Sequence, residues 1–316
     1  MLATAPLISV VIPVHNAQNF LAVCLSSVVA QAGPFKLQII VVDDGSTDTS
    51  PEIARQHVQV ICLQQPNLGP SAARNAGIAM AQGEFIAFLD ADDLWPPDKL
   101  AVQLSALTRQ PEAALVFGDC RQFDATGPWQ RTQFESDGLG IAAWGEGATV
   151  PCAYSRLLHE NFITTGSVLV RRSVLVELGG FAENLRLVED LELWLRIARR
   201  YPIAWCDPVC LYRRRHGANT SQDAEAMGLA YLEVLSRQTE HAHGSAGAAI
   251  PELKRLQACE YQHLAALALS RGAAPAACQR AFRAIATRFS WRAAWLLCRA
   301  STMLLRQRYS VARHRA

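Results

Sequence analysis

The sequence lacks three features that would direct it out of the cytoplasm or into a membrane. Its 316 residues contain no run of eighteen apolar residues, no basic segment at the start, and nine cysteines without a CxxC pair or a metal-ligand spacing. A membrane-spanning helix needs about 20 apolar residues, signal peptides open with positive charge, and disulfide or zinc frameworks show regular cysteine spacings. We therefore expect a cytoplasmic protein with no spanning helix and with reduced, mostly buried thiols.

Acidic residues are missing from the last part of the chain. No Asp or Glu follows Glu260, whereas ten arginines lie between Arg271 and Arg315. The range 281–305 mixes arginine with Trp, Phe and Leu, which is typical of amphipathic helices on anionic membranes. An apolar stripe packed on the rest of the protein or on a second copy explains the pattern as well. Both interpretations stay open, and nucleic-acid binding is not expected because no DNA- or RNA-binding module is recognisable.

Strands and helices are predicted to alternate over the first 120 residues. Short apolar runs indicate buried strands, and longer amphipathic segments indicate helices. This alternation predicts an α/β fold with a mostly parallel central sheet flanked by helices, and such sheets bind ligands at the carboxyl ends of their strands. The expected strands are 7–14, 37–42, 58–63, 85–89 and 114–117, and the expected helices are 20–30, 51–57, 71–81 and 98–108.

The pattern becomes less regular beyond residue 120. The range 121–147 is rich in Gly, Trp and Gln and predicts loops with a hairpin, whereas the chain after Gly217 is rich in Ala, Leu and Arg and predicts helices alone. We therefore expect a boundary near Asn219, between a domain over 1–217 and a basic helical region over 218–316. Between these regions, strands are expected at 168–170, 203–205 and 209–212, and helices at 173–178 and 187–200.

Three carboxylates, Asp90, Asp92 and Asp93, follow the expected strand 85–89. Three such groups cannot all be buried without compensation. An Asp-x-Asp pair at a strand end is suited to hold Mg²⁺ or Mn²⁺, with water and substrate phosphates completing the coordination shell. Taken alone, the pattern fits an acidic loop that opens the next helix at least as well.

A series of short segments has a recognisable order along the chain. They are Ile8–Asn16, Val42–Asp48, Gly69–Gly77, Asp90–Asp92, Gly166–Ser167, Gly179–Phe181 and Glu189–Asp190. Together these segments resemble the family 2 glycosyltransferases, which have a GT-A nucleotide-sugar fold. The resemblance runs from about residue 7 to residue 216 and leaves the terminal hundred residues outside it. It implies a donor and metal half over 1–120 and an acceptor half over 121–217.

The resemblance implies a nucleotide site built from the first half. The carboxylate of Asp44 would accept a hydrogen bond from the base, and the backbone near Pro13 would frame that base. Arg74 would contact the nucleotide, and Asp90 the ribose or a metal-bound water. Turn formation by the Asp-Gly-Ser sequence is the alternative for Asp44, and a solvated helix charge is the alternative for Arg74.

The resemblance also implies a divalent metal, Mn²⁺ or Mg²⁺, bound directly by Asp92. Asp93 would lie behind it, either supporting the site or capping the next helix. His216 would close over the site, where its imidazole could ligate Mn²⁺. A basic surface loop is the alternative for the segment that contains His216.

In the acceptor half the resemblance assigns the catalytic base to Asp190, which would take the proton from an acceptor hydroxyl. Glu189 would hydrogen-bond backbone or acceptor, and Gly166 and Ser167 belong to the same half. Stabilisation of the helix dipole by two acidic residues in its first turn is the alternative role for Glu189 and Asp190.

The expected function is inverting, metal-dependent transfer of a sugar from a nucleoside diphosphate, with UDP as the expected carrier. The expected acceptor is a hydroxyl of a glycan or of a lipid-linked acceptor, and the expected process is polysaccharide or glycoconjugate biosynthesis. A nucleotidyltransferase would carry a glycine-rich basic loop after its first strand, where this chain has Pro13–Asn16. A catalytically silent partner protein with the same fold would be expected to lose its acidic residues, yet all are present: Asp44, Asp90, Asp92 and Asp190.

Overall fold

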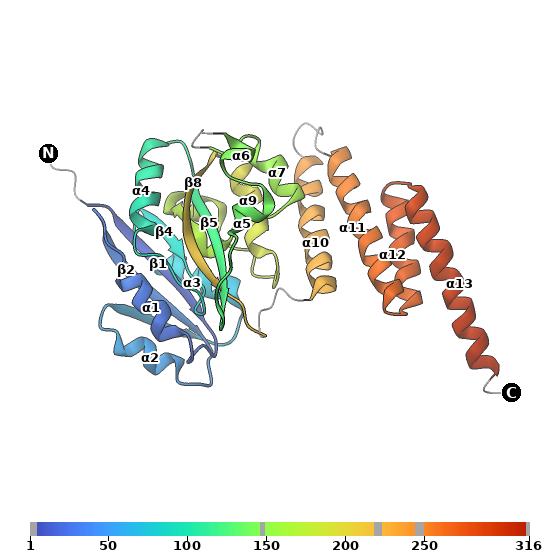
Figure 1. The fold of residues 1–316 in the computed structure, drawn as a ribbon, viewed down its shortest axis with the longest axis horizontal. Helices are drawn as coiled ribbons and strands as arrows, with labels where there is room; N and C mark the ends of the chain where they lie inside the picture. The colour runs from blue at the N-terminus through green and yellow to red at the C-terminus, as the bar shows by residue number, and fades with distance from the viewer. Residues whose placement is uncertain (1–4, 146–148, 218–222, 244–249, 314–316) are drawn as a thin grey trace. The chain divides into compact units, whose positions relative to one another are not determined.

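The computed structural model describes residues 5–145, 149–217, 223–243 and 250–313, and the chain divides into two compact units, Met1–Asn219 and Thr220–Ala316 (Figure 1). The boundary expected near Asn219 falls in 218–222, outside the described residues. Each unit has its own secondary structure: a sheet with helices in the first, and helices alone in the described part of the second.

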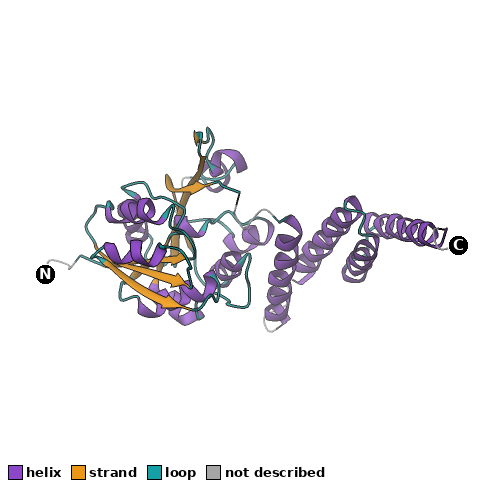
Figure 2. Ribbon diagram, turned by 90° about the horizontal axis from the view of Figure 1, so that it is seen from below, coloured by secondary structure: helices purple, strands orange, loops and turns teal. Residues whose placement is uncertain are grey.

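The first unit is built on an eight-stranded sheet, which confirms the predicted α/β fold with helices on both faces (Figure 2). The strand order is β3-β2-β1-β4-β7-β5-β6, and β8 pairs with β5. The first four strands are parallel, whereas β7 runs antiparallel to both β4 and β5. The strands are β1 Leu7–Val14, β2 Lys36–Asp44, β3 Val60–Gln65, β4 Phe85–Phe88, β5 Leu115–Asp124, β6 Gly127–Pro128, β7 Val168–Arg171 and β8 Ile203–Arg214.

The central strands are buried on both faces, as expected for a parallel sheet covered by helices. Every residue of β4 is buried. Helix α3 lies so close to β1 that a Cβ atom on Gly77 would come within 2.3 Å of a Val11 methyl group. The helices of this unit are α1 Leu21–Val29, α2 Ser50–Gln56, α3 Pro70–Met80, α4 Lys99–Arg109, α5 Gln133–Asp137, α6 Ile141–Trp144, α7 Ala153–His159, α8 Arg172–Leu178 and α9 Glu189–Ala198, with a 3₁₀ turn at Thr165–Ser167.

Three predictions need correction. The range 121–147 contains the end of β5, which pairs with β6 in a short hairpin, but also two short helices, α5 and α6. The two strands expected at 203–205 and 209–212 form one strand, β8, because a bulge opposite Asp119 carries the pairing with β5 across the irregular stretch. The expectation of mostly buried thiols is also wrong, since only three of the nine cysteines are buried, although all are free.

The second unit contains four helices in its described residues, which confirms the predicted C-terminal helices. Successive helices pack against each other through small side chains such as Ala265, Ala277 and Ala281, all fully buried. In the described part of the chain, no helix combines the length and hydrophobicity needed to cross a bilayer. The helices are α10 Ala224–His243, α11 Ile250–Ser270, α12 Ala274–Thr287 and α13 Trp291–Arg313.

Candidate active site

The polar residues expected in a donor site gather at one edge of the sheet. Strands β1, β2 and β4 are parallel neighbours, so their carboxyl ends lie side by side. Pro13 is the last residue but one of β1 and lies opposite Val42, and Asp44 ends β2. Asp90 follows β4 at the same edge. The sheet itself therefore brings these three predicted residues together.

Asp44 is built into the loop that leads to α3. Its carboxylate accepts hydrogen bonds from the backbone N–H groups of Leu68 and Gly69, at 2.9 and 2.8 Å, and from Nε2 of Gln65 at 2.7 Å. A carboxylate has about four acceptor positions, so these contacts leave room for one more donor. Gln65 is a partner that the sequence did not single out, since no local pattern pairs it with Asp44.

Arg74 joins the two halves of the site. Its guanidinium lies 2.8 Å from Oδ1 of Asp90 and 2.8 Å from Oε1 of Glu189, and it packs 5.3 Å from the centre of the Phe181 ring. Burial alone would lower the pKa of Arg74, but the two carboxylates raise it above its ordinary value. Because the residue is only 4% exposed, the alternative of a solvated helix charge is wrong.

Asp92 and His216, which are 124 residues apart in sequence, meet at the same edge. Nε2 of His216 lies 2.9 Å from Oδ2 of Asp92, and the imidazole stacks on the Phe20 ring at 5.2 Å. Arg214 donates from its Nε to the backbone oxygen of Asp92 at 2.8 Å and lies over the Phe20 ring. The end of β8 is thus fastened over the acidic loop, and the His216 segment is no detached surface loop.

Asp93 supports this arrangement from behind. It is 4% exposed, and its Oδ1 accepts a hydrogen bond from the backbone N–H of Arg214 at 2.7 Å. Burial, followed by the charges of Asp92 and Asp90, raises the pKa of Asp93 well above its ordinary value. The alternative of a helix cap is wrong, because α4 begins after Asp98.

The donor set suits a divalent cation that also binds a substrate. Among the described residues there is no cluster of three or more His, Cys, Asp or Glu placed to bind a metal ion. Asp92 and His216 nevertheless offer an oxygen and a nitrogen, and their side chains are 27% and 26% exposed. Mg²⁺ and Mn²⁺ can bind with so few protein ligands when phosphate oxygens and water complete the coordination shell.

Asp190 lies at the start of α9 with its carboxylate held by three donors. Its Oδ1 accepts from the backbone N–H of Leu191 at 2.7 Å and from Asn161 at 3.3 Å, and its Oδ2 accepts from Thr165 at 3.2 Å. Burial raises the pKa of Asp190, and these hydrogen bonds oppose the rise. Val188, which precedes the pair, has φ of +52°, a strained conformation for a β-branched residue that is typical of functional sites.

Glu189 differs from its neighbour because it has a cationic partner. Burial raises the pKa of Glu189, and the contact with Arg74 opposes that rise. Asn161 and Thr165, which hold Asp190, were not expected from the sequence, because they reach it only through the fold. The paired acids therefore have different direct partners: Glu189 is paired with Arg74, whereas Asp190 accepts hydrogen bonds from Asn161 and Thr165.

Gly166 and Ser167 lie behind Asp190 and are buried. The Gly166 carbonyl accepts from the Trp95 indole at 2.8 Å, and the Ser167 carbonyl accepts from Gln103 at 2.6 Å. A Cβ atom on Gly166 would come within 2.7 Å of Leu211. These contacts fix the 3₁₀ turn that presents Thr165 to Asp190.

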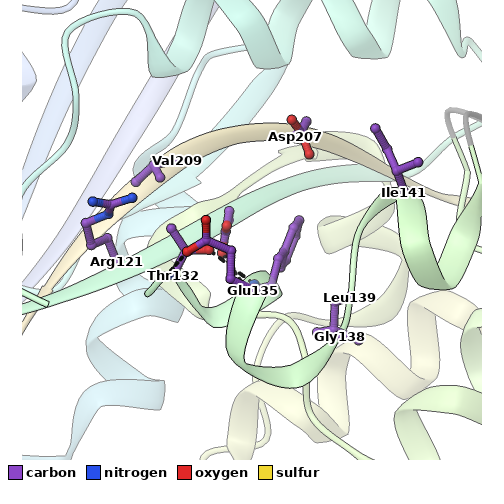
Figure 3. A pocket seen from close by; sticks show the side chains of 10 residues that line it. Arg121, Thr132, Glu135, Gly138, Leu139, Ile141, Asp207 and Val209 are labelled. Carbon is purple, nitrogen blue, oxygen red and sulfur yellow. Dashed lines mark hydrogen bonds between the residues drawn. The ribbon is translucent and has the colours of Figure 1, made fainter. Parts of the chain in front are cut away.

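An acidic hollow lies between α5, β5 and β8 (Figure 3), within the range expected to form the acceptor half. Its volume is about 500 Å³, and its lining includes the carboxylates of Asp119, Glu135 and Asp207 together with Arg121. Burial raises the pKa of Asp119, whose Oδ1 accepts from the backbone N–H of Phe134 at 2.9 Å. No sequence pattern predicted this hollow.

The hollow is connected to Asp190 through two hydrogen bonds on adjacent residues. Gln133, which begins α5, accepts a hydrogen bond from the Thr164 hydroxyl at 3.2 Å. The next residue, Thr165, donates to Asp190. The short helix that lines the hollow is therefore attached to the turn that holds the expected base.

Comparison with known proteins gives a consistent result. A family model described as "Glycosyl transferase family 2" matches residues 9–179. The chain is 30% identical over 244 residues to the putative teichuronic acid biosynthesis glycosyltransferase TuaG of Bacillus subtilis, covering 75% of this chain and 90% of that protein. It is 28% identical to an uncharacterised glycosyltransferase of Rickettsia typhi, covering 74% of each. It spans only 36% of the length of a relative from Rickettsia conorii.

Solved structures share the fold. TarS of S. aureus in complex with UDP-GlcNAc superposes with a TM-score of 0.67 at 18% identity, covering 94% of this chain and 87% of that one. The mannosyltransferase PcManGT from Pyrobaculum calidifontis, in complex with GDP-Man and Mn²⁺, gives 0.57 at 20% identity, covering 96% and 88%. The likeness extends over the sheet whose carboxyl edge carries the candidate site.

Proposed function

Because the chain belongs to glycosyltransferase family 2, we propose that it transfers a sugar from a UDP-linked donor to a hydroxyl of a glycan or lipid-linked acceptor, with inversion at the anomeric carbon. The observation that carries this proposal is the Arg74 bridge. One buried guanidinium binds Asp90 of the donor half and Glu189 of the acceptor half, each at 2.8 Å. The two substrates would therefore meet at groups that are already held together.

The donor would bind along the edge formed by Pro13, Asp44, Arg74 and Asp90. Asp44 has room for one further donor, such as the imide N–H of uracil, after its three contacts within the chain. The structure of TarS with UDP-GlcNAc supports UDP as the carrier, and that of PcManGT with GDP-Man keeps GDP as the second candidate.

A divalent cation, Mn²⁺ or Mg²⁺, would be held by Asp92 and His216. When bound, it would supply positive charge that stabilises the leaving diphosphate. The 2.9 Å approach of the carboxylate and the imidazole supports this assignment, as does the Mn²⁺ in the PcManGT complex. Asp93, hydrogen-bonded to the backbone of Arg214, would keep the His216 segment in place.

Asp190 would act as the general base. Its three hydrogen-bond donors orient the carboxylate, and a pKa raised by burial makes it a better proton acceptor than an ordinary aspartate. Proton removal would allow the acceptor hydroxyl to attack opposite the diphosphate, which inverts the anomeric centre. Glu189, paired with Arg74, would position the acceptor rather than take its proton.

The acceptor would enter through the acidic hollow beside α5. Carboxylates such as Asp207 and Glu135 accept hydrogen bonds from sugar hydroxyls, and Gly166 and Ser167 would support the site through Thr165. A lipid-linked acceptor would bring the enzyme to the inner face of a membrane as a peripheral protein. Polysaccharide biosynthesis is the corresponding process, in line with the printed name of TuaG.

Calorimetric titration of the full chain with UDP, GDP and TDP, in Mn²⁺, in Mg²⁺ and in EDTA, tests the proposal. We expect tight binding of UDP that is lost in EDTA. Hydrolysis of a panel of UDP-sugars, with water as the acceptor, then identifies the sugar. A folded protein that binds no nucleotide and hydrolyses no donor would instead be a silent partner with the same fold.

A further inference from the structure

Helix α13 has apolar side chains on two opposite faces. The inner face is fully or almost fully buried and packs against α12 and α11. With 3.6 residues per turn, the opposite side of the helix carries a second apolar stripe. The inner residues are Ala293, Leu296 and Ala300, and the outer residues are Trp291, Trp295 and Leu305, which are 83%, 55% and 57% exposed.

The outer stripe continues into the turn between α12 and α13. Phe289 is 60% exposed and contacts Trp291 edge to face, with ring centres 5.4 Å apart. The inner face of α13 alone forms its part of the core of the helical bundle, so these exposed aromatic side chains are not needed for that core.

Three arginines spaced by seven residues line one side of this stripe. Arg292, Arg299 and Arg306 are all exposed, and the guanidinium of Arg299 lies 4.8 Å from the centre of the Trp295 ring. No Asp or Glu follows Glu260 in the sequence. The surface therefore combines apolar area with positive charge and has no acidic residue of its own segment to neutralise it.

We infer that this surface docks on an anionic phospholipid membrane, with α13 lying in the plane of the headgroups. We call it the α13 outer face: Phe289, Trp291, Trp295, Leu305, Arg292, Arg299 and Arg306. The inference specifies, and rests on, the peripheral membrane contact of the proposed function. Tryptophan beside arginine suits the boundary between headgroups and acyl chains. A second copy would bring the same arginines to the contact, so the charge favours anionic lipid.

Co-sedimentation of the full chain with vesicles tests this inference. We expect binding to vesicles of phosphatidylglycerol and phosphatidylcholine, weaker binding as salt increases, and little binding to phosphatidylcholine alone. The double variant Trp291→Ser/Trp295→Ser should bind about tenfold more weakly. The affinity for the anionic vesicles, and only for these, should fall on the order of 100-fold in the triple variant Arg292→Gln/Arg299→Gln/Arg306→Gln.

Leu229→Ser is the matched control, because Leu229 is 47% exposed on α10 but lies outside the α13 outer face. The inference would be overturned if Leu229→Ser lost as much vesicle affinity as the tryptophan or arginine variants. It would also be overturned if the native chain did not bind anionic vesicles at low salt. So would a dimer, seen by analytical ultracentrifugation, that the tryptophan variants dissociate. Calorimetry with UDP on the same samples shows separately whether the nucleotide site is intact.

Discussion

The proposed donor and acceptor sides of the candidate site are held in place by different means. On the donor side, polar residues follow the parallel strands β1, β2 and β4, so the sheet alone brings them to one edge. On the acceptor side, Asp190 is held by Asn161 and Thr165, which come from the segment between α7 and β7. The donor side is thus a property of the sheet, whereas the acceptor side is assembled from loops and short helices.

The electrostatics of the two sides differ as well. Asp90 is paired with Arg74, and its side chain is 42% exposed and therefore open to a ligand. Burial raises the pKa of Asp190, which has neutral hydrogen-bond donors. The first arrangement suits hydrogen bonding to a ribose hydroxyl or a metal-bound water, and the second suits proton transfer. The comparison therefore separates residues whose loss weakens binding from residues whose loss slows the reaction.

The largest effect should follow from Asp190→Asn. An amide cannot take the proton, so we expect hydrolysis of the UDP-sugar to slow by about 10²–10⁴, while calorimetric UDP binding stays unchanged. Glu112→Gln, an exposed carboxylate outside the site, is the control and should leave both quantities unchanged. Near-normal hydrolysis by Asp190→Asn would show that the base lies elsewhere.

The same residue predicts the pH dependence of the reaction. The base acts only when unprotonated, so kcat falls as the pH drops through the pKa of Asp190. Because burial raises that pKa, the loss should begin at a higher pH than for an ordinary aspartate, whose pKa is about 3.9. A kcat profile of the native enzyme, measured where circular dichroism shows it folded, tests this direction.

Arg74→Met should break the connection between the two sides. It leaves Glu189, whose side chain is 12% exposed, without its cationic partner. Loss of one member of a buried pair costs about 3–5 kcal/mol. We expect the free energy of unfolding, measured with urea, to decrease by an amount near the lower end of this range. The reason is that the other partner, Asp90, is partly solvated. UDP binding should weaken too.

The matched control is Arg55→Met, since the pair of Arg55 with Glu52 is 3.7 Å long and exposed on both sides. Such surface pairs contribute little. If the two variants lost equal stability, the Arg74 bridge would be no stronger than a surface contact. Arg74→Lys should also have a lower free energy of unfolding than the native chain, because an ammonium group cannot contact both carboxylates in the way that the two-armed guanidinium does.

The same contrast explains what the sequence predicted. The strands, their order along the chain and Asp44, Asp90 and Asp92 could be located because apolar runs followed by acids are local patterns. The contacts of Arg74 with Glu189 and of His216 with Asp92 join residues 115 and 124 apart, and no local pattern specifies such pairs. Helix α5 and the acidic hollow were missed because five helical residues are too few to show a period.

A smaller effect is expected from Asp92→Ala. Loss of even an outer partner of a metal ligand costs about 10–100-fold in metal affinity, so removal of a direct ligand should weaken Mn²⁺-dependent UDP binding by at least that factor. In EDTA, where UDP binding is expected to be lost in both proteins, Asp92→Ala and the native chain should not differ. Asp98→Ala, which removes the N-cap residue of α4, is the control. Equal UDP affinity in Asp92→Ala and the native chain with Mn²⁺ would exclude Asp92 as a ligand.

The smallest effect should come from Asp207→Asn on the acceptor side. Asp207 lines the acidic hollow and is exposed to solvent. We expect the substitution to remove about one hydrogen bond to the saccharide, which would lower the affinity for it about two- to tenfold. The probe is the best-binding member of a panel of neutral di- and trisaccharides, titrated in the presence of UDP. Asp137→Asn removes the same charge at the exposed end of α5 and should bind the probe normally. Weaker UDP binding in Asp207→Asn, with the saccharide unaffected, would assign the hollow to the donor and remove the separation between the two sides.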